Sequence, residues 1–147
     1  MTQAVLPQFR ARRAGVVMNV SSTTTLKPLP MLAVYTASKA AMNAFTASLA
    51  LELEPFGVRA RLVLPGSAPE TSFGQNAQAQ MRAPGVTVPE AYADFARGVF
   101  ARMAARRSGP VTRAAAVAEA VWRAVTDPSC PVRLPAGADA EALAAAP

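Results

Sequence analysis

The 147-residue sequence contains no histidine and one cysteine, Cys130. The absence of histidine excludes Ser-His-Asp and Cys-His catalysis, histidine metal sites and histidine-based pH switching. A single cysteine permits neither an internal disulfide nor a cysteine-based zinc site, so we expect no metal centre. No apolar run approaches the ~18 residues that span a bilayer, and the N-terminus lacks the pattern of a signal peptide. We therefore expect a cytoplasmic protein with no membrane partner.

Acidic residues are also scarce, with 9 Asp and Glu against 15 Lys and Arg, which gives a net charge of +6. A basic balance raises the question of a nucleic-acid partner. The arginines are scattered, however, apart from short clusters at residues 10–13 and 102–107, and aromatic residues are not interleaved with them. We therefore expect a solvated basic surface and no nucleic-acid binding.

Apolar residues make up 52% of the chain, which suits one folded domain, and their spacing predicts alternating strands and helices. Residues 16–20 and 58–64 are apolar, β-branched runs that are typical of parallel strands buried on both faces. Between them, residues 35–54 contain neither Gly nor Pro and place apolar side chains at helical spacing. This order predicts a strand–helix–strand unit with a right-handed crossover.

Outside that unit, the sequence predicts the end of a helix that runs into an Arg-rich loop at residues 3–13, and a mobile loop with one helical turn at 67–88. It predicts two more helices at 89–107 and 113–126, and a short strand at 132–134. Pro89 suits the first position of one helix and Thr112 the cap of the next. Helical spacing predicts that Trp122 lies in the core, and Cys130 is expected in a surface turn. The Ala-rich C-terminus, residues 142–147, is expected to fray. The fold class is α/β, a partial doubly wound parallel sheet of Rossmann-like type with about three strands and four helices.

Polar side chains with catalytic potential follow the two main predicted strands. Ser22 comes just after the first strand, and Tyr35 and Lys39 lie four residues apart on one face of the long helix. A lysine ammonium beside a tyrosine favours the phenolate form, which suits proton transfer near neutral pH. Ligands bind at the carboxyl ends of strands in open α/β sheets, where Pro65 and Gly66 also lie. The ordinary alternatives are a turn residue for Ser22, a helix-start aromatic for Tyr35 and a solvated side chain for Lys39.

Three segments together resemble the second half of the short-chain dehydrogenase/reductase family. They are Gly-Val-Val-Met-Asn-Val-Ser-Ser at 15–22, Tyr-Thr-Ala-Ser-Lys at 35–39 and the strand ending in Pro-Gly at 58–66. The resemblance implies that Tyr35 is the general acid/base, that Lys39 binds the nicotinamide ribose and promotes ionisation of Tyr35, and that Ser22 hydrogen-bonds the substrate oxygen. It also implies contacts with the nicotinamide end of the cofactor from Pro65, Gly66, Ala68 and Thr71, besides Tyr35 and Lys39.

The resemblance implies an NAD(P)-dependent oxidoreductase, with NAD or NADP as cofactor, that interconverts an alcohol and a carbonyl compound as its small-molecule substrate. The family's glycine-rich phosphate turn is absent, because the eight glycines are dispersed along the chain. We therefore expect one partial domain over residues 1–147, the C-terminal half of the family's fold, with a substrate lid at about 67–110. The alternative is a truncated, non-catalytic remnant that acts by self-association or with a separate N-terminal half. The long helix forms subunit contacts in the family, so a homo-oligomer is expected.

Overall fold

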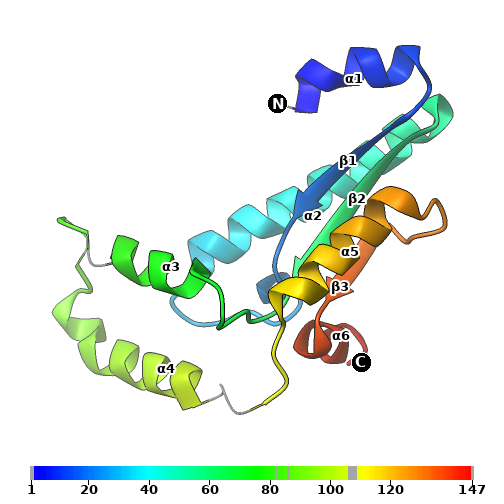
Figure 1. The fold of residues 1–147 in the computed structure, drawn as a ribbon. Coiled ribbons are helices and arrows are strands. Elements are labelled where there is room, and N and C mark those ends of the chain that lie inside the picture. The colour runs from blue at the N-terminus through cyan, green and yellow to red at the C-terminus, as the bar shows by residue number, and fades with distance from the viewer. Residues whose placement is uncertain (1, 82, 86, 106–108, 147) are drawn as a thin grey trace.

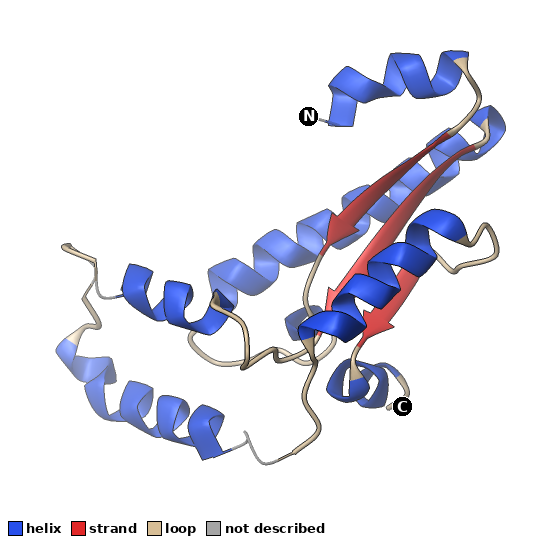
Figure 2. Cartoon of the chain, in the orientation of Figure 1, coloured by secondary structure: helices blue, strands red, loops and turns tan. Residues whose placement is uncertain are grey.

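The computed structural model describes residues 2–81, 83–85, 87–105 and 109–146 (Figures 1 and 2). Three parallel strands form one sheet in the order β1-β2-β3: β1 (Gly15–Val20), β2 (Val58–Pro65) and β3 (Arg133–Ala136). The helices of the described residues are α1 (Thr2–Ala11), α2 (Ala33–Leu53), α3 (Phe73–Met81), α4 (Ala93–Ala105), α5 (Ala114–Thr126) and α6 (Ala138–Ala144). The predicted α/β class and parallel sheet are confirmed.

Strand β2 is the centre of the sheet because it pairs in parallel with both of its neighbours. Val20 of β1 lies opposite Val63, and Pro65 lies opposite Ala136 of β3. The carboxyl ends of the strands therefore meet at one edge, with α2 on one face of the sheet and α5 on the other (Figure 1). This edge is where the sequence places its candidate site residues.

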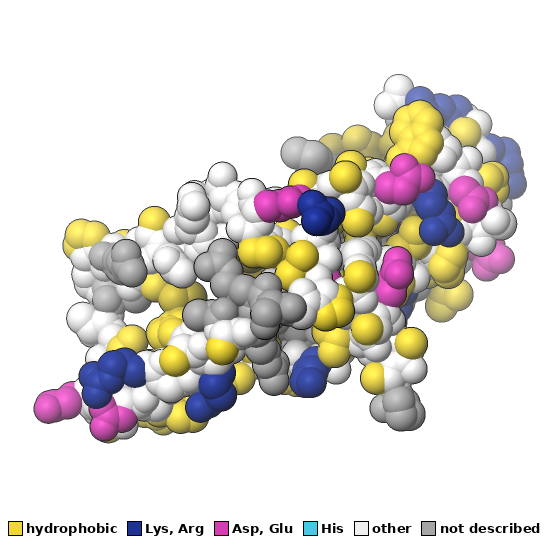
Figure 3. All heavy atoms as spheres, turned by 60° about the horizontal axis from the view of Figure 1, so that its bottom comes forward, with side chains coloured by type: hydrophobic (Ala, Val, Ile, Leu, Met, Phe, Trp, Pro, Cys, Tyr) yellow, Lys and Arg dark blue, Asp and Glu magenta, His cyan; other side chains and the backbone are white. Residues whose placement is uncertain are grey.

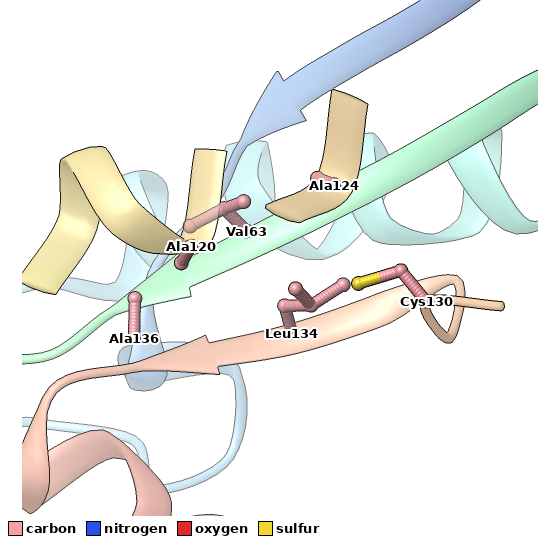
Figure 4. Close-up of a cluster of buried hydrophobic side chains, with 6 residues drawn as sticks. All are labelled: Val63, Ala120, Ala124, Cys130, Leu134 and Ala136. Atoms are coloured by element: carbon pink, nitrogen blue, oxygen red, sulfur yellow. The ribbon is translucent and has the colours of Figure 1, made fainter. Parts of the chain in front are cut away.

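The core has one layer on each face of the sheet, which explains why the strands read as continuous apolar runs. On the α2 face, the cluster consists of Val17, Leu49, Leu53, Val58 and Ala60. On the α5 face, it consists of Val63, Ala120, Ala124, Cys130, Leu134 and Ala136 (Figure 4). Alternation along β2 directs successive side chains to opposite layers.

The described residues form six helices, two more than the approximate number of four that the sequence predicted. Helix α3 replaces part of the predicted mobile loop, where the sequence indicated only a single helical turn. Helix α6 extends as far as Ala144 into the Ala-rich end, residues 142–147, that was expected to fray. Helix α6 is anchored because the carboxylate of Asp139, near its start, accepts hydrogen bonds from distant parts of the chain. Local sequence contains no signal for such long-range anchoring.

Several single-residue predictions were wrong. Cys130 is buried in the α5 layer rather than in a surface turn, whereas Trp122 is 65% exposed because α5 turns Ala120 and Ala124 toward the sheet. Arg113, not Thr112, occupies the cap position of α5. A 3-10 turn at Glu90–Tyr92 precedes α4, which begins at Ala93. The predicted last residues of that helix, 106 and 107, lie outside the described residues.

The surface is mixed in character. On the face seen in Figure 3, basic side chains are dispersed among acidic and apolar ones. Of the helices that the structure describes, none is both long enough and apolar enough to cross a membrane.

Candidate functional site

The end of β1 presents two buried serines at the carboxyl edge of the sheet. The amide of Ser21 donates to the carbonyl of Val63 at 2.8 Å, which extends the pairing of β1 with β2. Ser22 caps the 3-10 turn Thr23–Thr25, and its Oγ accepts hydrogen bonds from the amide and the hydroxyl of Thr24, each at 3.2 Å. Both bonds use Ser22 Oγ as an acceptor, so neither consumes the hydroxyl proton. The side chain is thus oriented and retains a donor for another group.

Tyr35 and Lys39 lie near the start of α2, one helical turn apart. The Lys39 Nζ lies 5.7 Å from the centre of the Tyr35 ring and donates to the carbonyl of Val20 at 3.0 Å. Because Val20 is the last residue of β1, this bond holds the helix start against the strand end that leads into Ser22. The half-buried Tyr35 ring also contacts Phe73 of α3, with ring centres 6.4 Å apart.

A second layer of polar contacts, which was not predicted from the sequence, supports this arrangement. The hydroxyl of Ser21 donates to Oδ1 of Asn43, and Nδ2 of Asn43 donates to the hydroxyl of Thr25 at 3.0 Å. Asn43 lies one turn after Lys39, so the four-residue spacing from Tyr35 through Lys39 to Asn43 was the signal available in the sequence. These bonds fix α2 against the turn that contains Ser22.

The end of β2 leads into the segment predicted to contact a cofactor. The amide of Gly66 donates to Oγ1 of Thr112 at 3.1 Å, and the amide of Ser67 donates to a carboxylate oxygen of Asp139 at 2.7 Å. Farther along, the hydroxyl of Thr71 donates to the carbonyl of Ala68 at 2.8 Å. Pro65, Gly66, Ala68 and Thr71 therefore lie on one ordered connection from β2 toward α3, and Thr112 and Asp139 are supports that the sequence did not indicate.

The predicted lid region, about residues 67–110, contains α3 and α4, and residues 82, 86 and 106–108 of it lie outside the description. A cavity of about 170 Å³ lies between residues 27–30 and α4, where Lys27, Val99, Arg102 and Met103 contribute to its walls. Within the described residues, no group of three or more acidic or Cys side chains is placed to hold a metal ion.

Comparison with known proteins places these motifs in a family. The family model described as short chain dehydrogenase matches residues 1–82. The very-long-chain 3-oxoacyl-CoA reductase of Aspergillus fumigatus is 30% identical over 109 residues, which cover 74% of this chain and 30% of that enzyme.

Two solved structures share the fold. A short-chain dehydrogenase from Streptomyces avermitilis superposes with a TM-score of 0.71 at 29% identity, over 97% of this chain and 48% of that one. An NAD⁺-bound xylitol dehydrogenase gives a TM-score of 0.67 at 27% identity, over 93% of this chain and 54% of that one. The chain thus spans about half the length of these structures and less than a third of the first curated relatives. The family model covers more than half of the sequence, and the chain belongs to the short chain dehydrogenase family.

Proposed function

We propose that this chain carries the catalytic residues of a cytoplasmic, homo-oligomeric, NAD(P)-dependent oxidoreductase that interconverts a small-molecule alcohol and its carbonyl compound. The observation that supports this most directly is the position of Lys39. Its ammonium lies over the Tyr35 ring and is bonded to the strand end that continues into Ser22. A general acid/base, a cation beside it and an oriented hydroxyl are the groups that carbonyl reduction requires.

The donor set fits the nicotinamide riboside end of such a cofactor. A lysine ammonium has three N–H donors. In Lys39 one of them is used by the carbonyl of Val20, and the other two suit the paired hydroxyls of a ribose. Pro65, Gly66 and Ala68 would contribute backbone contacts, and Thr71 a side-chain contact. When bound, the nicotinamide supplies or accepts the hydride, and the similarity to an NAD⁺-bound dehydrogenase supports this cofactor class.

The protein groups would then manage the proton and the charge on the substrate oxygen. In the direction of reduction, the Tyr35 hydroxyl gives its proton to the carbonyl oxygen as that atom becomes an alcohol oxygen. The neighbouring Lys39 ammonium stabilises the phenolate that remains. The Ser22 hydroxyl, whose proton is not used by Thr24, donates a hydrogen bond to the same substrate oxygen. In oxidation, the Tyr35 phenolate accepts the proton instead.

A second candidate function is a non-catalytic remnant that acts by self-association or with a separately made N-terminal half. The observation that favours it is the outer edge of β1, which within the described residues pairs with β2 alone. Val20 on that strand is 42% exposed, and α2 exposes Phe45 and Leu51. An open strand edge is a template for pairing with another chain.

Calorimetric titration of the purified chain with NADH and with NADPH, alongside its mass in solution, separates the two candidates. Saturable binding supports the enzyme, and the tighter ligand identifies the cofactor. The absence of binding by a folded chain supports the remnant and rejects the enzyme for this chain.

Tyr35→Phe tests the chemical role in the form that binds cofactor. Loss of the hydroxyl should abolish turnover with little change in cofactor affinity, because Phe keeps the ring that faces Lys39. Tyr92→Phe is the matched control, since Tyr92 is 55% exposed and lies on the turn before α4. Near-normal turnover in Tyr35→Phe would refute the proposed proton transfer.

A further inference from the structure

We infer that Thr112 and Asp139 are positioning residues for the cofactor, because they fix the backbone of Gly66 and Ser67 at the end of β2. The inference rests on the proposed function, in which this backbone contacts the nicotinamide. Neither Thr112 nor Asp139 would contact the cofactor itself. Each would act through the hydrogen bond that it accepts from the backbone amide of Gly66 or Ser67.

Thr112 is the centre of the arrangement and is completely buried. Its Oγ1 accepts the Gly66 amide at 3.1 Å, and its own amide donates to the carbonyl of Ser67 at 2.8 Å. The hydroxyl has one proton and two neighbouring acceptors, Asp139 Oδ1 at 2.6 Å and the carbonyl of Ala136 at 2.8 Å. One side chain therefore joins the residues after β2, the end of β3 and the start of α6.

Asp139 supplies the second set of bonds. Its Oδ2 accepts the Ser67 amide at 2.7 Å, and its Oδ1 accepts the amide of Ala140 at 3.0 Å besides the contact with Thr112. The ion pairs found in the described residues do not include Asp139, so its partners are neutral N–H and O–H donors. Hydrogen bonds to a carboxylate are roughly twice as strong as those between neutral groups. The Asp139 carboxylate thus holds the amide of Ser67, which lies 72 residues earlier in the sequence.

Two glycines show how closely the backbone approaches these groups. A Cβ on Gly66 would lie 2.2 Å from Oδ1 of Asp139. A Cβ on Gly137, whose φ is +99°, would lie 2.2 Å from Oγ1 of Thr112. Any side chain at either position would displace the carboxylate or the hydroxyl. The clamp therefore consists of two polar side chains and the two glycines that admit them.

A third contact ties the same connection to α5. Oε1 of Glu70 accepts the amide of Ala114 at 2.8 Å and so satisfies a free N–H in the first turn of that helix. The stretch from residue 66 to residue 70 is thus held at both of its ends. A cofactor contact made by this stretch would inherit its rigidity, which lowers the entropy lost on binding.

Asp139→Ala is the test, read by amide hydrogen exchange of the ligand-free chain and by NADH titration of the same preparations. Removal of the carboxylate frees the Ser67 amide, so its exchange should accelerate by about tenfold or more and NADH should bind about tenfold more weakly. Asp139→Asn should stay within about threefold of wild type in both measurements. Its amide oxygen can accept from Ser67, while its NH2 donates to Thr112 and the Thr112 hydroxyl turns to Ala136. The Ala140 amide alone loses its acceptor, and neither measurement follows that amide.

Glu141→Ala is the matched control, because Glu141 lies on the same helix and is exposed. It should leave both measurements unchanged. If Asp139→Ala fails to fold, Thr112→Val gives a second test at the Gly66 amide. Val keeps the shape of Thr and removes the nearer acceptor at 3.1 Å, which leaves that amide only the longer bond of 3.4 Å to the Ala136 carbonyl. Urea unfolding of each variant separates a local opening from a loss of global stability.

Each outcome has a distinct meaning. Unchanged Ser67 exchange in Asp139→Ala overturns the clamp, whether or not NADH binds. Faster exchange with unchanged NADH affinity overturns the link between the clamp and the cofactor. If the wild-type chain binds neither NADH nor NADPH, the proposed function fails and the positioning role fails with it, and faster exchange in the variant would then report a purely structural clamp.

Discussion

One buried hydroxyl joins β1 to α2, and its removal should measure how firmly α2 is held against the sheet. Thr46 is completely buried; its Oγ1 accepts a hydrogen bond from Nδ2 of Asn19 at 2.9 Å and donates to the carbonyl of Met42 at 2.8 Å. Val has the shape of Thr without the hydroxyl. Thr46→Val therefore leaves the packing in place and deprives the Asn19 amide of its acceptor.

The expected cost follows from which partner is left without a bond. The Met42 carbonyl lies inside α2 and keeps its backbone hydrogen bond. Losing the additional bond from the Thr46 hydroxyl therefore costs little free energy. A buried donor without a partner costs ~1–3 kcal/mol. Because Asn19 is half-buried rather than fully buried, we expect a loss of about 1–2 kcal/mol in the free energy of unfolding. For a chain of this size that corresponds to a decrease in Tm of roughly 2–8 °C.

Urea unfolding in two backgrounds tests this reasoning. In Asn19→Ala the donor is absent, so Thr46→Val should then cost almost nothing, and the coupling free energy should equal the loss in the wild-type background. Thr126→Val is the control, because Thr126 makes the same bond to a carbonyl four residues earlier but is exposed. An equal cost of Thr46→Val in both backgrounds would refute the role assigned to the Asn19–Thr46 bond.

Three further substitutions probe other parts of the fold. Leu62→Ala empties a completely buried site on β2 and should cost about 2–5 kcal/mol in urea unfolding. Gly57→Ala should lower the Tm, because Gly57 has a φ of +66° and a Cβ there would lie 2.8 Å from the carbonyl oxygen of Arg13. The side-chain and then the backbone hydrogen bond from Ser129 hold the pKa of Asp127 below its ordinary 3.8. The stability that the ionised Asp127 carboxylate contributes to the fold is therefore present above pH 3.8 and is lost as pH falls through the lower folded-state pKa. Asp127→Asn should remove this contribution, so the free energy of unfolding should fall less steeply with decreasing pH in the acid range.

Features that depend on local periodicity were predictable from the sequence. The runs at 16–20 and 58–64 are strands, and the pair Tyr35 and Lys39 shares one helix face because a four-residue spacing makes one turn. The parallel arrangement followed from a helix placed between two buried strands. Both rules involve neighbours within one element or consecutive elements, so they hold without knowledge of the rest of the fold.

Features that depend on distant contacts were not predictable. Thr112 precedes an Ala-rich run and so resembles a helix cap, yet its hydroxyl is bonded to Gly66, 46 residues earlier. Arg61 lies in an apolar strand but is only 8% exposed, and its guanidinium donates to the carbonyls of Ala60 and Pro128; burial is the main cause that lowers its pKa. No local sequence pattern indicates the hydrogen-bond partners of Thr112 or Arg61, because only the packing of the folded chain brings these residues together.

The two strand ends that form the candidate site are supported by different parts of the chain. The end of β1 is held by α2, through Lys39 and through Asn43. The end of β2 is held from the opposite side, by Thr112 before α5 and Asp139 in α6. Proton transfer and cofactor positioning would therefore depend on separate supports, one from the strand–helix–strand unit and one from the C-terminal third of the chain. This explains how a motif that is visible in residues 15–66 can depend, for its geometry, on a residue as distant as Asp139.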